Sequence, residues 1–404
     1  MAYIVDLRSD CVTKPTKSMK HAMVNSALGD DVFGEDPTVN MLESKVATLL
    51  GKQAALYVPS GTMSNLLAVM VHCKKRGSEA IVGNLSHIYK YEQGGAAHLA
   101  GVLLSTIQNK PDGTVDLCEL EKKFRGDDIH EPITSLVAIE NTHNSCGGKV
   151  RSNVTFQWTR DKLPYSGLLT KIYLNNFHVL PLEWVDKLSE ICKKHSIPLH
   201  MDGARMMNAS IALKEPPSRL VQGCDSISIC FSKGLSAPVG SCLVGSYHFI
   251  EQARRLRKML GGGMRQAGVI AAAAVVALDE VMPLLEFDHK RAQILAKTIH
   301  GLQLKNFLVD VSGVHTNIVM VNISKDIPLQ AEQLVQRLQQ VSLDETQGDC
   351  KTSNDEGVIV KAVSFSDKIM RLCLHADITD EELWMAIMKI TFVFKQLDAH
   401  YSTK

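Results

Sequence analysis

The chain has 404 residues and, with 44 basic and 43 acidic side chains, a formal net charge of +1. This balance gives no indication of a nucleic-acid or anionic-membrane partner, and the length is sufficient for a large core and two domains. Ten cysteines without a C-x-x-C pair indicate reduced thiols, and the N-terminal residues resemble a strand rather than a signal peptide. The longest apolar run, Val269 to Leu278, is too short to span a bilayer. We therefore expect a cytoplasmic protein, although the sequence leaves import into an organelle open.

Between about residues 37 and 244, helical and strand patterns alternate, which is typical of a helix-covered, mainly parallel sheet. Pro37 is expected to start a helix with apolar residues at helical spacing, and Gly51 to end it. The segments expected after it are, in order, the strand Ala54–Val58, the helix Thr62–Cys73, the strand Leu136–Ile139, a helix after Pro181 with its apolar stripe from Trp184 to Cys192, and the strands Ile197–Met201 and Ser226–Phe231.

A smaller α/β unit is expected from about residue 280 onward. Its predicted elements are a helix over Asp288–Leu302, strands at Thr316–Val321 and Ile369–Leu374, and a last helix from Thr379. The polar stretch Asp344–Glu356 is predicted to be a flexible loop. The sequence thus predicts an α/β fold with a large domain over residues 1–279, N-terminal arm included, and a small domain over residues 280–404.

Two reactive side chains follow neighbouring predicted strands. Asp202 ends the apolar stretch Ile197–Met201, and Lys233 follows the alternating segment Ser226–Phe231. Alone, the Asp would be read as a turn former and the Lys as a surface charge. Together they match the needs of a pyridoxal 5'-phosphate (PLP) enzyme, which uses a carboxylate against the pyridine nitrogen and a lysine for the Schiff base. Glycine and proline also crowd the Lys, as expected where backbone approaches a bulky cofactor: Gly234, Pro238 and Gly240.

A candidate phosphate site lies upstream, at Ser60, Gly61 and Thr62, between a predicted strand and a predicted helix. Small residues there expose backbone N–H groups at a helix N-terminus, which suits a phosphate. An ordinary capped turn is the alternative, but a Schiff-base lysine downstream favours phosphate binding.

Eight motifs taken in chain order resemble the low-specificity L-threonine aldolases, and they cover most of the chain. They are Leu7–Asp10, Gly34–Asp36, Pro59–Asn65, Ser86–Ile88, Glu140–Asn144, His200–Arg205, Ser232–Leu235 with Ala237–Ser241, and Gly261–Gln266. The resemblance implies an aspartate-aminotransferase-like, PLP-dependent transferase fold, with a mainly parallel seven-stranded sheet in the large domain. It also implies PLP as cofactor, no metal, and a homodimer or homotetramer whose active sites draw on two subunits. The implied reaction is cleavage of L-threonine or L-allo-threonine to glycine and acetaldehyde.

The resemblance also assigns roles to matching residues. Lys233 is similar to the Schiff-base lysine and Asp202 to the partner of the pyridine nitrogen. Ser9, Arg205 and Arg371 resemble a clamp for the substrate carboxylate, which suits the bidentate geometry of arginine, and Arg205 is also close enough to Asp202 to reach the cofactor.

Two histidines and one arginine complete the implied site. His87 resembles the histidine that stacks on the cofactor ring and moves protons, and His130 one near the substrate hydroxyl; either would otherwise be read as a structural histidine. His143 is an alternative to them, although a role in organising its loop is favoured. Arg265, with the basic run Arg254–Lys258, is either a solvated surface or a source of contacts to a neighbour's cofactor phosphate.

Residues 151–179 interrupt the resemblance, because relatives run directly from Gly-Gly-Lys-Val to Leu-Pro-Leu-Glu. A tolerated surface insertion is one interpretation; a block to the active site or a subunit interface is the other. Three functions therefore stay open: a threonine aldolase, another PLP activity such as β-elimination or transamination, and a catalytically impaired isoform.

Overall fold

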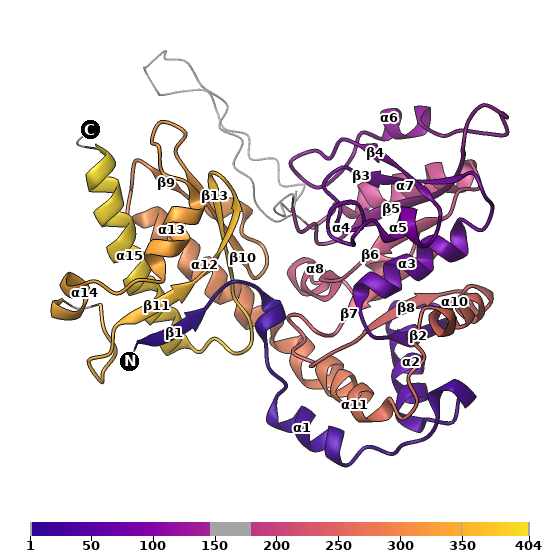
Figure 1. The fold of residues 1–404 in the computed structure, drawn as a ribbon, viewed down its shortest axis with the longest axis horizontal. Coiled ribbons are helices and arrows are strands. Elements are labelled where there is room, and N and C mark those ends of the chain that lie inside the picture. Colours follow the sequence, from indigo (N-terminus) through magenta and orange to yellow (C-terminus); the bar gives the residue numbers. More distant parts are fainter. Residues whose placement is uncertain (1, 146–178, 349, 403–404) are drawn as a thin grey trace.

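A seven-stranded sheet forms the centre of the larger of two α/β units (Figure 1). The computed structural model describes residues 2–145, 179–348 and 350–402. Six strands of the sheet are parallel, and β8 runs antiparallel to both of its neighbours. The strand order is β2 (Ala54–Val58), β8 (Ser241–Gly245), β7 (Ser226–Cys230), β6 (Leu199–Asp202), β5 (Ile133–Glu140), β3 (Ser78–Gly83) and β4 (Leu103–Ile107). The predicted mainly parallel seven-stranded sheet is confirmed.

Helices cover both faces of this sheet. On one face, β2 and β8 share an apolar cluster with α3 (Gly61–His72) and α10 (Tyr247–Met259). The other face contributes to the main core together with α2 (Pro37–Leu50), α7 (Leu182–Lys194), α8 (Met206–Leu213) and α11 (Gly268–Val276). The remaining helices of this unit are α1 (Lys17–Val24), α4 (His87–Lys90), α5 (Gly95–His98), α6 (Leu117–Lys122) and α9 (Pro217–Leu220).

Local signals explain why the helix α2 lies where the sequence predicts it. The Asp36 carboxylate accepts hydrogen bonds from the backbone N–H groups of Thr38 and Val39 at the helix start. Pro37 occupies the first helical position, where its missing N–H costs nothing. Gly51 ends the helix with a φ of 61°, a left-handed conformation that a glycine adopts without steric cost.

The smaller unit is built on a four-stranded antiparallel sheet. Its strand order is β12 (Val363–Ser366), β13 (Ile369–Cys373), β10 (Ile318–Ile323) and β9 (Phe307–Leu308). The helices α12 (Leu285–Gly301), α13 (Ala331–Leu338) and α15 (Asp380–Ser402) share one apolar core with this sheet. The expected small α/β unit is therefore present.

The N-terminal arm corrects the expected division of the chain, which placed all of residues 1–279 in the large unit. Strand β1 (Tyr3–Asp6) pairs in parallel with β11 (Val358–Lys361), and Val5 and Leu7 are fully buried in the core of the small unit. The arm then crosses to the large unit, where α1 packs on α11 (Figure 1). Alternating apolar residues predict a strand, but they do not tell which sheet the strand joins.

The stretch Asp344–Glu356 is the second correction, because it begins with the helix α14 (Leu343–Gln347) instead of a flexible loop. Within α14, the Glu345 carboxylate is fully buried and pairs with Arg337, at 2.6 Å, and with Lys389. A carboxylate is tolerated in a core only when cations and hydrogen-bond donors surround it, and these come from α13 and α15. Polar composition alone therefore suggested exposure.

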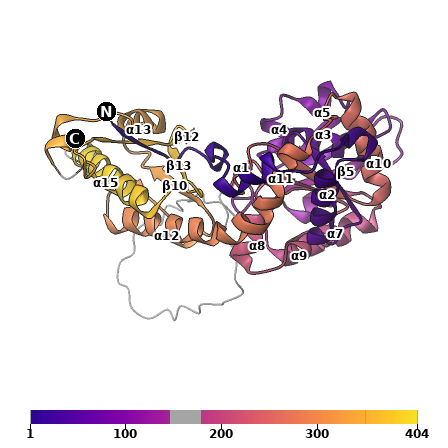
Figure 2. The same ribbon diagram turned by 90° about the horizontal axis from the view of Figure 1, so that it is seen from below.

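The two units are joined by a continuous helical run of 34 residues, Gly268–Gly301 (Figure 2). It contains α11, the π-helical segment η3 (Ala277–Val281), the 3-10 helix η4 (Met282–Leu284), and α12. Leu285 belongs to the core of the large unit and Ala292 to the core of the small unit, so α12 links the two. The expected boundary after residue 279 falls inside this run. In the part of the chain that the structure describes, this run is long and apolar enough to cross a membrane by length and composition, but half of its most apolar window is buried in the protein, as in core helices.

Candidate active site

Asp202 and Lys233 lie at the same edge of the large sheet. Asp202 is the last residue of β6, and Lys233 follows the adjacent parallel strand β7. Because carboxyl ends of parallel strands meet at one edge, the expected placement of the two residues at a common edge is confirmed. The backbone carbonyl of Lys233 accepts a hydrogen bond of 2.9 Å from the Thr13 hydroxyl, so the N-terminal arm lies against this turn.

The Asp202 carboxylate is buried and held by neutral donors. Its Oδ2 accepts from the Asn65 amide at 2.8 Å, and its Oδ1 accepts from the backbone N–H of Ala204 at 3.1 Å. None of the described residues forms a salt bridge with it. A buried carboxylate that is not directly bonded to a cation is unfavourable by itself, so this position suits a positively charged ligand group.

A hydrogen-bond chain behind Asp202 fixes the orientation of Asn65. The Asn65 amide nitrogen donates to Asp202 and, at 2.8 Å, to Glu92, so its oxygen must accept from His200 Nε2. His200 Nδ1 then accepts from the Ser226 hydroxyl at 2.9 Å. Burial lowers the pKa of His200 to about 4, so its ring is neutral. Asn65 thereby presents both of its N–H groups to carboxylates.

His87 lies beside the same carboxylates. Its Nδ1 is 2.9 Å from Glu92 Oε1, and its backbone N–H donates to Glu140 at 2.8 Å. Burial alone would lower the pKa of His87, but the hydrogen bond to Glu92 and the charges of Asp202 and Glu140 outweigh it and raise the pKa. The nearest polar atoms of His87, Glu92 and Asp202 lie within 4.8 Å of one another, a spacing also found in metal sites, but here protons on His87 and Asn65 join them.

The three residues expected to clamp the substrate carboxylate lie around Asp10. Arg205 donates to both oxygens of the buried Asp10 carboxylate, from Nε at 2.8 Å and from Nη2 at 2.6 Å. Burial alone would raise the pKa of Asp10, but the attached guanidinium outweighs it and holds the pKa well below its usual range. Arg371 and Arg205 both donate to Asn144 Oδ1, and the half-buried Ser9 precedes Asp10 and caps the next turn through Cys11 N–H. The structure therefore brings Ser9, Arg205 and Arg371 together.

The candidate phosphate site lies at the same sheet edge, where β2 passes into α3. The Ser60 hydroxyl accepts from the backbone N–H of Met63 at 3.2 Å, which is the capped turn weighed as the alternative. A Cβ on Gly61 would lie 2.6 Å from Cys230 Sγ, so only glycine allows this turn to approach the end of β7 that precedes Lys233. Phosphate binding at Ser60, Gly61 and Thr62 stays a prediction.

Two predicted residues lie away from this cluster. His130 precedes β5, at the edge of the sheet opposite to Asp202; its side chain is 83% exposed and bonds Asp128. Arg265 is exposed too, pairing with Asp30 at 2.8 Å and lying over the Phe33 ring. Among the described residues, no hydrogen bond or ion pair joins either of them to Lys233, and the role predicted for each stays a prediction. Arg257, in the same basic run, is instead buried against Asp31.

Four residues of the site were given no role by sequence reasoning: Asp10, Asn65, Glu92 and Asn144. Three of them lie inside motifs whose neighbours received roles, whereas Glu92 lies in none of the motifs. His143 is buried and accepts from the backbone N–H of Ser145, in agreement with the favoured loop-organising role.

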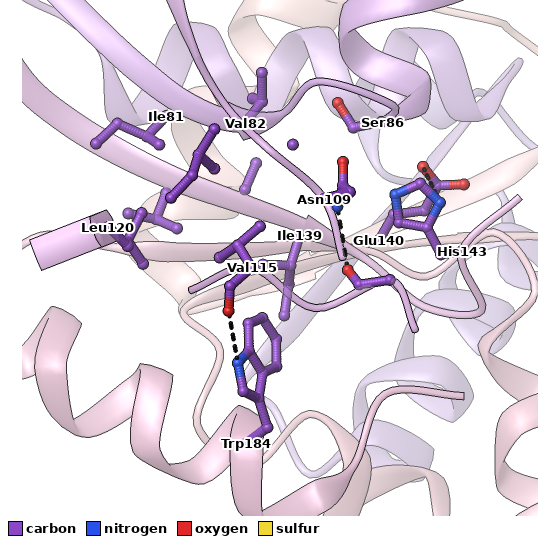
Figure 3. Close-up of a pocket in the computed structure, with 15 residues that line it drawn as sticks. Ile81, Val82, Ser86, Asn109, Val115, Leu120, Ile139, Glu140, His143 and Trp184 are labelled. Atoms are coloured by element: carbon purple, nitrogen blue, oxygen red, sulfur yellow. Dashed lines mark hydrogen bonds and ion pairs between the residues drawn. The ribbon is translucent and has the colours of Figure 1, made fainter. Parts of the chain in front are cut away.

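A small cavity behind Glu140 is separate from this cluster (Figure 3). Its walls are mostly apolar side chains of β3, β4 and β5, and Glu140 and His143 form one side of it. Of the residues that the sequence suggested for the site, only the alternative candidate His143 lines it. The cavity therefore lies against Glu140, whose carboxylate accepts the backbone N–H of His87.

The β-eliminating lyase family matches residues 6–160 and 174–326. A probable low-specificity L-threonine aldolase 2 from Arabidopsis thaliana is 45% identical over 381 residues, covering 94% of each chain. A low specificity L-threonine aldolase from Escherichia coli (strain K12) is 40% identical over 323 residues, covering 80% of this chain and 86% of the relative. A solved structure of a putative L-allo-threonine aldolase from Listeria monocytogenes EGD-E superposes with a TM-score of 0.71 at 20% identity, covering 96% of both chains, which confirms the expected fold.

Proposed function

This chain belongs to the β-eliminating lyase family and is a PLP-dependent lyase, and we propose that it cleaves L-threonine and L-allo-threonine to glycine and acetaldehyde. The observation that carries the proposal is the edge of the large sheet that holds Lys233 and the buried carboxylate of Asp202. Two arginines, Arg205 after β6 and Arg371 on β13 of the small unit, converge on Asn144. The names of the relatives supply the substrate class.

The residues present fit PLP. The buried Asp202 carboxylate forms no salt bridge with a described residue, and a protonated pyridine nitrogen would supply a directly bonded cation. Lys233 would hold the cofactor covalently, and the N-terminus of α3, with Ser60, Gly61 and Thr62, would face the phosphate. When bound, PLP supplies an electron sink that stabilises negative charge at the substrate Cα.

The clamp orients the substrate. Arg205 and Arg371 hold the α-carboxylate, which sets the bond at Cα that is cleaved. Arg205 stays in place because Asp10 binds its Nε and Nη2 and leaves Nη1 for the ligand side.

His87 is the proton acceptor that the chain itself offers to the β-hydroxyl group. Its Nδ1 donates to Glu92, so the neutral ring has its lone pair on Nε2. General-base catalysis by a side chain in hydrogen-bond reach of a hydroxyl contributes about 10²- to 10⁴-fold to such a reaction. The pairing with Glu92 stabilises the imidazolium that forms when the proton arrives.

The direct test is a threonine-cleavage assay with purified protein and PLP, in which acetaldehyde is measured through NADH-dependent reduction and glycine by chromatography. Equal amounts of both products support the proposal. The variant Lys233→Ala is the matched control and should release neither. If the unmutated protein binds PLP but releases no aldehyde, the proposal is wrong.

A second PLP activity, β-elimination or transamination, is the alternative, and the name of the matched family favours β-elimination. Elimination from threonine yields ammonia and 2-oxobutyrate, and transamination requires an added oxo acid. Either pattern without aldehyde would replace the aldolase proposal.

The third alternative is an isoform impaired by the segment 151–179, nearly all of which lies outside the described residues. The family match leaves residues 161–173 unmatched, which agrees with an insertion in this region. Deleting residues 151–179 and comparing turnover and oligomeric state tests it; unchanged values contradict impairment.

We also propose a homodimer or homotetramer in the cytoplasm. The exposed side chains of His130 and Arg265, which pair with Asp128 and Asp30 in their own chain, favour a site completed by a second subunit. Light scattering and cell fractionation test the two statements.

A further inference from the structure

The amide oxygen of Asn144 lies between the two arginines of the clamp. Arg205 Nη1 and Arg371 Nη1 each donate to this one oxygen at 3.1 Å. The backbone N–H of Asn144 donates to Glu140 at 2.8 Å, which ties the residue to the end of β5. A neutral oxygen therefore occupies the point where two guanidinium groups converge.

The charges around this point are not balanced. Asp10 pairs with Arg205, whereas Arg371 has no carboxylate partner among the described residues and bonds only Asn144 and the Arg8 carbonyl. The Nε of Arg371 is buried without a hydrogen-bond partner there. Burial and the nearby charge of Arg205 lower the pKa of Arg371. The clamp thus has one positive charge and one donor in excess.

An α-carboxylate would supply both the negative charge and the missing acceptors. The guanidinium groups bind the neutral Asn144 amide through one oxygen, whereas a carboxylate adds an opposite charge and can accept two parallel hydrogen bonds. A substrate carboxylate therefore competes well against the Asn144 amide for the same donors.

We propose that Asn144 is a placeholder, a positioning residue that occupies the substrate-carboxylate position and withdraws when substrate binds. The placeholder rests on the proposed function, because it requires an amino-acid substrate. Asn144 keeps the two guanidinium groups converged before substrate binds. Because substrate must displace it, Asn144 raises KM, whereas kcat is little affected because Asn144 makes no contact with the bond that is cleaved.

In the competing role, Asn144 keeps its contacts with both arginines and orients them while the substrate carboxylate binds beside it. The two roles predict opposite effects of removing the side chain. If Asn144 is a placeholder, its removal makes carboxylates bind more tightly. If Asn144 orients the arginines, its removal makes carboxylates bind more weakly.

The test uses the PLP-loaded full chain and two variants, Asn144→Ala and Asn144→Asp. Calorimetric titration with 3-hydroxybutyrate, which is threonine without its amino group, measures carboxylate binding apart from catalysis. The Asn144→Ala variant should bind about 3- to 10-fold more tightly, the worth of one ordinary hydrogen bond. The Asn144→Asp variant should bind at least about 10-fold more weakly, because its own carboxylate occupies the clamp. KM for threonine should shift in the same directions, with kcat changed by less than about 3-fold.

The controls are Asn40→Ala and Asn40→Asp, which make the same changes at an exposed position of α2; they should leave binding unchanged. Weaker or unchanged binding by Asn144→Ala overturns the placeholder, as does an unaffected Asn144→Asp. If the unmutated protein releases no aldehyde, the proposed function is wrong. The binding shifts in the two variants would then still support the placeholder.

Discussion

The Asp10–Arg205 pair offers a sharp test because the same chain segment contains an exposed pair of the same chemistry. The side chains of Asp10 and Arg205 are 0% and 6% exposed, and two hydrogen bonds join them. Asp6 and Arg8 are also joined bidentately, but their side chains are 24% and 46% exposed. Replacing either Asp by Asn keeps the shape and removes the charge.

The expected magnitudes differ because of burial. Asp10→Asn leaves the Arg205 guanidinium buried without a counter-charge, which costs about 3–5 kcal/mol of unfolding free energy. Asp6→Asn breaks a solvent-screened pair worth about 0.2–1 kcal/mol. The Asp10 pKa is depressed, so the stability contributed by Asp10 is present above its unfolded pKa and is lost only as pH falls through the folded value. The deficit of Asp10→Asn should therefore stay constant between pH 5 and 8.

Urea unfolding of both variants, with and without PLP, measures these differences. An unchanged slope of free energy against urea shows that the same surface is exposed on unfolding. The reasoning is refuted if Asp10→Asn loses no more stability than Asp6→Asn. Carboxylate binding should also weaken in Asp10→Asn, because Arg205 is released from its orientation, and stay unchanged in Asp6→Asn.

Three further predictions concern single side chains. Lys233→Ala should lose the visible absorbance of lysine-linked PLP and at least about 100-fold of aldehyde release; retention of both excludes its role. Glu92→Gln should lower the pKa of His87, measured by NMR titration of the ring. The raised pKa of His87 stabilises the fold at low pH, and this stability is lost as pH rises through that pKa, so the variant should lose it. An unchanged His87 titration contradicts the pairing with Glu92. Burial raises the pKa of Asp288 to about 7; the charges of Asp10 and Asp377 add to this effect and Arg291 opposes it. The free energy of unfolding should therefore fall by about 1.4 kcal/mol per pH unit as pH rises from 4 toward 7. Asp288→Asn should flatten this slope in urea unfolding, and an unchanged slope would assign the pH dependence to other groups.

Much of the large unit follows from local signals. Helix α2 begins and ends where Asp36, Pro37 and Gly51 predict it, because caps and left-handed glycines act within a few residues. The order of strands and helices also predicts parallel strands, and therefore a common edge for Asp202 and Lys233. Strand β1 is the counterexample: its pattern is local, but its partner β11 lies more than 350 residues away.

The sequence by itself determined the chemistry of this protein: a lysine, a carboxylate and two arginines, in an order that resembles one family. Only the tertiary structure decided how these groups are paired. Asp10 meets Arg205 across 195 residues, and Asn144 meets Arg371 across 227. Residue type and spacing predict which groups are available for chemistry, whereas a buried pair depends on how separate elements pack, since burial decides whether a charge needs a partner and which partner is in reach.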